Sequence, residues 1–222
     1  MARKIVRLTV DHLAALEAPT RECLFWELDP VRRARVPAHE RAAEKEAWLS
    51  EVLREWGSCG RVALVDDRPV GYVVYVPAAL APGASVLPTA PVSPDALLMT
   101  TAYVLAEHRG GGLGRMLVQG MARDLIERGG VRAIEAFGDT RDGNGGRECP
   151  QQCVLPAGFL GGVGFKTQRA HGTTPRLRMD LRSALTWRDE VELALEKLRG
   201  VVRPARQPAR PVSRGARRQA GG

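Results

Sequence analysis

Residues 103–118 read Tyr103-Val104-Leu105-Ala106-Glu107-His108-Arg109-Gly110-Gly111-Gly112-Leu113-Gly114-Arg115-Met116-Leu117-Val118 and join an apolar strand to an amphipathic helix through a glycine-rich turn. The first backbone N–H groups of a helix lack partners within it, and the helix dipole adds positive potential there. Glycines also let a ligand come close to the backbone. The segment therefore predicts a phosphate site at the start of a helix.

Two common phosphate-binding motifs do not fit this turn. A P-loop needs Lys and then Ser or Thr after its last glycine, whereas Gly114 is followed by Arg115 and Met116. A dinucleotide fingerprint needs a third glycine where this chain has Leu117 or Arg115, depending on where the motif starts. Spacing therefore excludes both kinds of nucleotide loop.

The spacing that fits is RxxGxG, filled by Arg109, Gly112 and Gly114 between a strand and a helix. It resembles the acyl-CoA pyrophosphate loop of the GNAT superfamily of N-acyltransferases. Val104 and Ala106 stand where that family usually has Val and Pro, so only the proline is missing. The helix that follows carries one apolar stripe and ends at a Gly-Gly pair.

The resemblance implies acetyl-CoA, or another acyl-CoA thioester, as co-substrate and no metal. It implies direct attack on the thioester by a primary amine of a small molecule, peptide or protein. The strand backbone at Tyr103 or Val104 would polarise the thioester oxygen. A CoA-binding sensor or scaffold with little or no catalysis is the alternative. The residues placed against the cofactor are Tyr103, Val104, Arg109, Gly110, Gly111, Gly112, Leu113, Gly114 and Arg115.

The catalytic part of the family's pattern is incomplete. The family often places a general-acid Tyr four residues before a Gly-Phe pair, and before Gly164-Phe165 that position holds Leu160. Cys153 is the candidate to supply the proton instead, because a thiol at a helix N-terminus can have a lowered pKa. An inert buried cysteine is the competing interpretation.

Glu27 is the candidate that binds or deprotonates the acceptor amine, since it falls in the region that lines the acceptor site in the family. Asp29 in the same region and Glu135 in a later strand are further candidates, and a solvated charge at a helix end is the competing interpretation for the first two. His171 is predicted to be a surface residue or part of the acceptor rim.

Composition indicates one domain with a sizeable core: 222 residues, 44% hydrophobic and 26% charged. We find no secretory signal and no membrane span, which predicts a cytoplasmic protein.

The four cysteines do not form a disulfide framework, so reduced thiols are expected. A zinc site at Cys149 and Cys153, completed by Cys23 or His171, would lack the usual second cysteine pair, so no metal site is predicted.

The net charge of +8 comes from the C-terminal tail. Seven Arg and no acid lie in residues 199–222, whereas the preceding residues hold 26 basic and 25 acidic side chains. Nucleic-acid binding by this tail is only a lesser alternative, because Arg outnumbers Lys 29 to 4 in the whole chain and no aromatic residue interrupts the tail. A homodimer is left open.

The pattern of apolar runs and turns predicts an α/β (α+β) fold, a central mixed, mostly antiparallel sheet flanked by helices. The element order agrees with the GNAT order. The predicted domain spans 1–185, followed by an extra helix at 186–200 and a disordered Arg-rich tail at 201–222. Strands are expected at 5–10, 61–65, 70–76, 96–104, 131–137, 165–170 and 176–181, and residues 66–69 indicate a hairpin between the second and third. Helices are expected at 12–17, with Asp11 as its cap, at 37–56 and at 113–128, with a short one from Pro156.

Overall fold

The computed structural model describes residues 2–16, 18–141 and 154–181 of the chain. The chain divides into two compact units, Met1–Leu185 and Thr186–Gly222. The helix predicted at 186–200 and the tail predicted at 201–222 lie outside the described residues.

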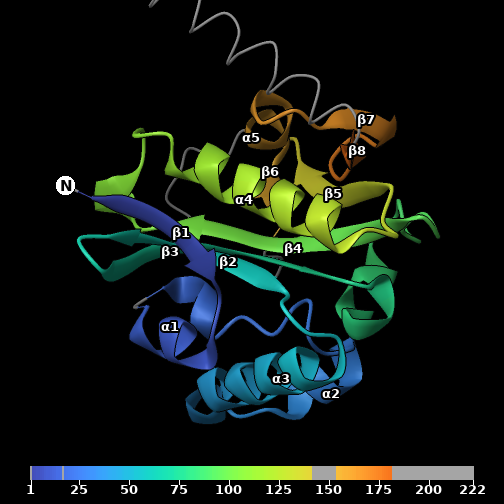
Figure 1. Ribbon diagram of the computed structural model, residues 1–222. Helices are drawn as coiled ribbons and strands as arrows, with labels where there is room; N and C mark the ends of the chain where they lie inside the picture. Colours follow the sequence, from blue (N-terminus) through green and yellow to red (C-terminus); the bar gives the residue numbers. More distant parts are fainter. Residues whose placement is uncertain (1, 17, 142–153, 182–222) are drawn as a thin grey trace, which may run out of the picture. The chain divides into compact units, whose positions relative to one another are not determined.

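In the described part of the chain, eight strands form one mixed sheet in the order β1-β2-β3-β4-β5-β8-β7, with β6 paired to β5 (Figure 1). Of the strand pairs in these residues only β4–β5 and β5–β6 are parallel, so the predicted mostly antiparallel sheet is confirmed. The strands are β1 (Arg3–Arg7), β2 (Gly60–Val65), β3 (Arg68–Val76), β4 (Ala96–Val104), β5 (Ala133–Asp139), β6 (Leu155–Pro156), β7 (Lys166–Arg169) and β8 (Arg176–Asp180).

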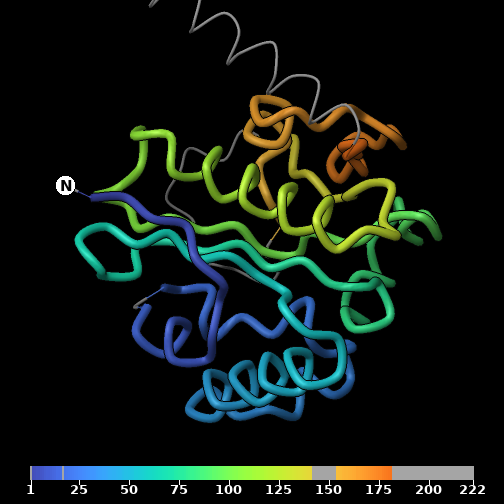
Figure 2. The backbone as a smooth tube through the Cα atoms, viewed as in Figure 1, coloured from blue at the N-terminus to red at the C-terminus, as the bar shows by residue number. Residues whose placement is uncertain are grey.

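Helices cover both faces of the sheet and bury a separate hydrophobic cluster on each. The tube in Figure 2 follows α4 (Leu113–Arg128) above the strands and α3 (Arg41–Glu55) below them. We call the upper side, which also carries α5 (Ala157–Gly162), the α4 face. The lower side, with α1 (Val10–Ala15), is the α1 face, and α2 (Pro30–Arg35) belongs to the same N-terminal region.

Local chemistry explains several element boundaries. Asp66 and Asp67 have φ of 48° and 63°, the left-handed pair of a type I′ turn, so the predicted hairpin between β2 and β3 is confirmed. The first strand ends at Arg7 rather than Val10, because Thr9, and not a residue inside the helix, caps α1 by accepting from the His12 N–H. The two-residue strand β6 was not predicted, because it is too short to leave a pattern.

Strands β4 and β5 separate soon after they begin. They pair only from Ala96 to Leu98 on β4, while β4 stays paired with β3 as far as Val104. Thr100 is the extra residue of a β-bulge, because Met99 lies opposite Tyr75 and Thr101 lies opposite Val74. Such bulges bend and twist a strand locally. Among the described residues no strand pairs with the β5-facing edge of β4 beyond Leu98.

Helix α4 is tied to the sheet by a buried polar group. Asp124, in the last third of α4, accepts hydrogen bonds from Arg61 of β2 and from the Tyr75 hydroxyl of β3. Arg128, one turn later, lies 3.8 Å from the same carboxylate and 4.1 Å above the Trp56 ring. These contacts fix the direction of the helix axis and thereby the place of its N-terminus.

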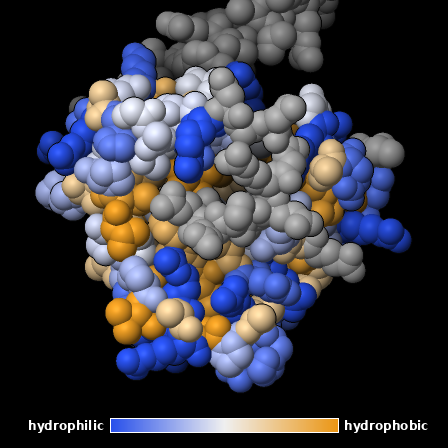
Figure 3. All heavy atoms as spheres, turned by 180° about the vertical axis from the view of Figure 1, so that it is seen from behind, coloured by the Kyte–Doolittle hydropathy of each residue, from blue (hydrophilic) through white to orange (hydrophobic). Residues whose placement is uncertain are grey.

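In the described part of the chain, almost all large apolar side chains are buried. Val31 and Val86 are the exposed large hydrophobic residues among those described. Figure 3 shows hydrophobic and hydrophilic residues interspersed on the reverse side. None of the helices in the described residues is both long and apolar enough to cross a membrane.

Candidate functional site

The glycine loop adopts a backbone that only glycine tolerates easily. Gly110 and Gly112 have φ of 78° and 82°, in the left-handed region. A Cβ added at either position would meet no atom within 4 Å, so the loop backbone faces open space there. A ligand can therefore approach the main chain closely.

Helix α4 begins without a side-chain cap. Gly112 is the N-cap residue and makes no side-chain cap bond, and the first helical bond runs from the Met116 N–H to the Gly112 carbonyl at 3.1 Å. The N–H groups just before Met116 thus precede the helical hydrogen-bond ladder. Together with the helix dipole they make a site suited to an anion.

The loop side chains that were predicted to contact the cofactor instead bond to nearby carbonyls or pack in the core. The Nε of Arg109 donates to the Val104 carbonyl at 2.8 Å, and its guanidinium lies 5.5 Å from the Tyr103 ring centre. Arg115 donates to the Gly162 carbonyl at 2.8 Å and so links α4 to α5. Leu113 is buried in the core, which leaves only its backbone for a ligand.

Packing around α4 and α5 explains why position 114 holds a glycine and position 160 an apolar residue. A Cβ at Gly114 would come 3.0 Å from the Phe159 ring, so this glycine permits close helix contact. Leu160 is fully buried on the α4 face, and its carbonyl accepts from the Phe165 N–H at 3.0 Å. The position that usually carries the family's Tyr is therefore part of the core.

One loop contact was missed by sequence reasoning. The Nη1 of Arg3, in β1, donates to the Gly111 carbonyl at 2.7 Å. A Cβ at Gly111 would lie 3.2 Å from the Nη2 atom of the same guanidinium. No local pattern signals this contact, because the two residues are 108 positions apart.

The two predicted residues at the end of β4 face opposite sides of the sheet. Val104 packs against the cluster on the α4 face, whereas Tyr103 packs against the cluster on the α1 face. Tyr103 and Glu107 line a cavity of about 470 Å³ on the α1 side. The other residues that line it are Ala15, Pro19, Leu105 and Ala106.

Glu27 is buried in an ion pair on the α1 face. Its Oε1 lies 2.8 Å from the Nζ of Lys45 in α3, and both side chains are at most 2% exposed. Burial lowers the pKa of Lys45, but the Glu27 charge, Tyr72 and the hydrogen bond to Glu27 together outweigh burial, and the pKa rises. Lys45 also donates to the Cys23 carbonyl at 2.8 Å, while Glu27 Oε2 is buried without a hydrogen-bond partner.

The two other acidic candidates have occupied carboxylates. Asp29 is the N-cap of α2 and accepts from the backbone N–H groups of the residues that follow it, chiefly Arg32, which lowers the pKa of Asp29. Glu135 is the last β5 residue paired with β4 and is fully buried. It lies 3.1 Å from Arg176 Nε and 3.4 Å from Arg178 Nη1, and it accepts from a backbone N–H.

The thiol candidates lie partly outside the described residues. Cys149 and Cys153 belong to the part of the chain that is not described. Cys23 is disulfide-bonded, so the expectation of reduced thiols is wrong for this residue. Burial raises the pKa of Cys59 to about 12, which makes it unreactive.

No metal cluster occurs where the structure is described. Within residues 2–16, 18–141 and 154–181, no group of three His, Cys, Asp or Glu side chains is placed to hold an ion. His171 is exposed, and its Nδ1 accepts from the backbone N–H groups of Thr173 and Thr174 at 3.3 and 3.1 Å. It therefore shapes the turn between β7 and β8.

Comparison with known families agrees with this geometry. The model of the acetyltransferase (GNAT) family matches residues 21–146, which include the opening between β4 and β5, the glycine loop and α4. Among curated protein sequences, no significant match is found.

Solved structures share the fold at low sequence identity. An N-acetyltransferase from Staphylococcus aureus Mu50 is 15% identical, with a TM-score of 0.52 over 82% of this chain and 99% of the other. The PaiA N-acetyltransferase from Thermoplasma acidophilum, solved in complex with coenzyme A, is 14% identical, with a TM-score of 0.51 over 81% and 99%. Ribosomal-protein-alanine N-acetyltransferase from Brucella melitensis is 20% identical, with a TM-score of 0.50 over 80% and 99%.

Proposed function

Because this chain belongs to the GNAT acetyltransferase family, we propose that it transfers an acetyl group from acetyl-CoA to a primary amine of a small molecule, peptide or protein. The observation that carries the proposal is the uncapped, glycine-lined start of α4, next to the end of β4. The pyrophosphate binds to the backbone N–H groups of the loop and first helical turn. The pantetheine arm lies in the opening beside β4, where no strand in the described part of the chain pairs with the strand edge beyond Leu98.

The amine attacks from the other side of the sheet. Its path is the cavity of about 470 Å³ on the α1 side, where Tyr103 and Glu107 supply polar groups. The nitrogen lone pair forms a bond to the thioester carbon, the C–S bond breaks, and sulfur leaves with the electron pair. The nitrogen then loses a proton and the sulfur gains one. A strand N–H at Tyr103 or Val104 polarises the carbonyl oxygen.

Proton transfer is assigned to Cys153 and Glu27. In its reduced, thiol form Cys153 replaces the hydroxyl that Leu160 lacks and protonates the leaving thiolate. Glu27 receives the acceptor amine, because its Oε2 atom is buried with a free accepting position. Cys153→Ala and Glu27→Gln are each expected to reduce turnover while leaving the affinity for CoA unchanged. A melting curve for each variant checks that the fold is intact.

The decisive experiment measures binding and turnover together. Purified protein is titrated with acetyl-CoA by calorimetry, and thiol release is followed with a panel of small amines, peptides with a free N-terminus and lysine peptides. Amine-dependent thiol release is expected. Failure to bind acetyl-CoA would contradict the proposal entirely.

A CoA sensor is the second candidate function. The observation that favours it is Leu160, buried in the core at the position of the usual general acid. Tight CoA binding without thiol release from any amine in the panel supports the sensor. Turnover with one amine excludes it.

A further inference from the structure

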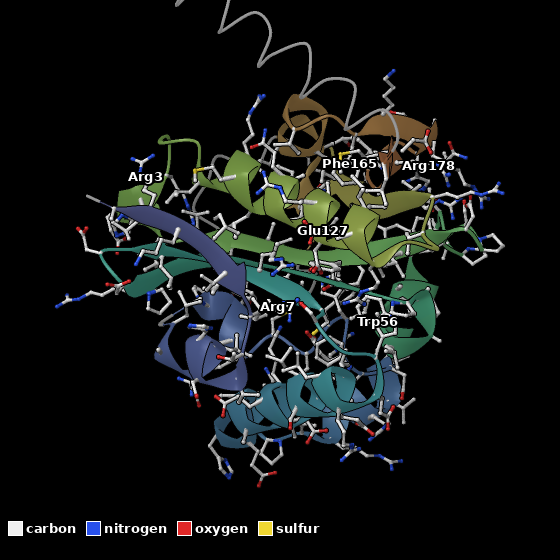
Figure 4. The ribbon with its side chains drawn as sticks, in the orientation of Figure 1. Arg3, Arg7, Trp56, Glu127, Phe165 and Arg178 are labelled. Atoms are coloured by element: carbon white, nitrogen blue, oxygen red, sulfur yellow. The ribbon has the colours of Figure 1, made fainter. Side chains whose placement is uncertain are left out.

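Strand β1 places a positive side chain directly on the glycine loop. Figure 4 labels Arg3 at the end of the sheet where this loop lies. Its guanidinium donates to the Gly111 carbonyl at 2.7 Å. The next residue, Lys4, instead pairs with Asp67 at 2.9 Å, so the two neighbouring cations of β1 have different partners.

The contact is held by rigid elements. β1 pairs with β2 along its whole length, with Arg3 opposite Val65. β1 also packs closely on α4, since a Cβ added at Gly120 would come 2.7 Å from the Ile5 side chain. The backbone of Arg3 is therefore fixed relative to the helix whose first turn forms the candidate site.

The loop needs such an outside contact. Gly110, Gly111 and Gly112 are consecutive and have no side chains to hold their peptide planes, so these planes rotate at little cost. In a planar trans peptide the C=O and the following N–H point in opposite directions. Fixing the Gly111 carbonyl toward β1 therefore turns the Gly112 N–H away from β1.

We propose that Arg3 is a positioning residue for the cofactor: by holding the Gly111 carbonyl it directs the Gly112 N–H toward the pyrophosphate of acetyl-CoA. This inference rests on the proposed function. Among the described residues no ion pair involves Arg3, so its positive charge also adds to the potential of the loop. Arg109 and Arg115 are each bonded to a backbone carbonyl elsewhere.

The test compares Arg3→Ala with the matched control Lys4→Ala, which removes a cation from the adjacent position of the same strand. Affinities for CoA and for 3′-dephospho-CoA are measured by calorimetry. Arg3→Ala is expected to weaken both ligands by the same factor, about tenfold, because the lost bond is made by a charged group and acts on the pyrophosphate. Lys4→Ala is expected to leave both affinities unchanged.

Two outcomes overturn the inference. One is an unchanged affinity in Arg3→Ala with an intact melting curve. The other is a loss confined to CoA, since Arg3 would then contact the 3′-phosphate rather than orient the loop. Wild-type protein that binds neither ligand contradicts the proposed function itself, whereas failure of the Arg3 assignment leaves wild-type binding intact.

Gly111→Ala provides an independent measurement. The added methyl would lie 3.2 Å from Arg3 Nη2, and Gly111 is not among the residues with positive φ, so the substitution displaces the guanidinium without straining the backbone. It is expected to weaken CoA binding in the wild type and to add nothing in Arg3→Ala. Equal losses in both backgrounds would show that Arg3 and the loop are not coupled.

Discussion

The two sides of the sheet present different kinds of chemistry. The start of α4 offers backbone N–H groups and glycines that face open space, with core residues such as Leu113 behind them. The α1 face holds the buried ion pair of Glu27 with Lys45, whereas the buried Asp124–Arg61 pair of the α4 face lies in the last third of α4, away from its start. A cofactor recognised by backbone needs a particular chain path, whereas an acceptor recognised by side chains depends on residues from distant elements. Donor and acceptor recognition should therefore respond differently to substitution.

The largest expected effect is on the stability of the α1 face. Lys45→Met leaves Glu27 buried without its partner, which is expected to cost about 3–5 kcal/mol of unfolding free energy. Lys4→Met removes a cation from an exposed pair and is the control, with an expected change of at most about 1 kcal/mol. Urea denaturation measures both, and equal changes would mean that the Glu27–Lys45 pair is not buried as described.

The same pair predicts a pH dependence. Because the pKa of Lys45 is raised above its ordinary value of 10.5 in the folded protein, its contribution to stability is complete below that pH. The contribution is lost as pH rises through the folded pKa. The unfolding free energies of the wild type and of Lys45→Met, measured by urea denaturation, should therefore keep a constant difference below the ~10.4 of free lysine and converge above that pH.

On the donor side, Gly112→Asp should abolish most CoA binding while Gly129→Asp should not. Both glycines have positive φ, 82° and 72°, and a Cβ at either position meets nothing within 4 Å, so neither substitution causes a clash. The ψ of 177° at Gly129 makes the control the more strained of the two variants, so backbone strain does not explain a larger loss in Gly112→Asp. Only Gly112 lies at the start of α4, where a carboxylate repels the pyrophosphate, and the expected loss is about 100-fold. Calorimetry measures the affinity of both variants for CoA, and equal affinities would show that the loop does not bind the pyrophosphate.

A fourth prediction concerns the buried group that holds α4 on the sheet. Asp124→Asn leaves the largely buried Arg61 without its carboxylate and is expected to cost about 2 kcal/mol of unfolding free energy. Glu127→Gln, at an exposed position of the same helix, is the control and should change little. If thermal unfolding finds the two variants alike, Asp124 does not hold α4 on the sheet.

The smallest effect is expected at α2. Asp29→Ala removes the cap, whereas Asp29→Asn keeps an accepting oxygen, so only the alanine variant should show a slightly lower melting temperature. The pKa of Asp29 is lowered from 3.8, so the stability that it contributes is present above that pH and lost as pH falls through the folded pKa. Activity should be unchanged in both variants, and a loss of turnover in Asp29→Asn would instead make Asp29 part of the acceptor site.

Sequence reasoning worked best where neighbouring residues decide the structure. The hairpin at Asp66 and Asp67 and the helix from Leu113 to Arg128 follow from local turn chemistry and periodicity, and the structure places both as predicted. The first strand ends earlier than predicted, and Thr9 rather than Asp11 caps α1. Both residues are acceptable caps, and only the folded chain selects one.

Reasoning about the acceptor side was weaker for a physical reason. Glu27 was chosen for its region of the chain, yet its environment is set by Lys45 from another helix. Glu135 likewise meets Arg176 and Arg178 only because β8 pairs with β5. Contacts between residues so far apart leave no periodic pattern in the chain.

The sequence by itself determined the mixed sheet and the glycine loop between β4 and α4, because strand periodicity, helix periodicity and the spacing of Arg109, Gly112 and Gly114 are local properties. Tertiary structure alone decided that β5 leaves β4 after Leu98, that Arg3 reaches Gly111, and that Leu160 is in the core. These depend on which segments pack together, and packing is settled by the buried surface of the whole domain rather than by any one stretch of chain.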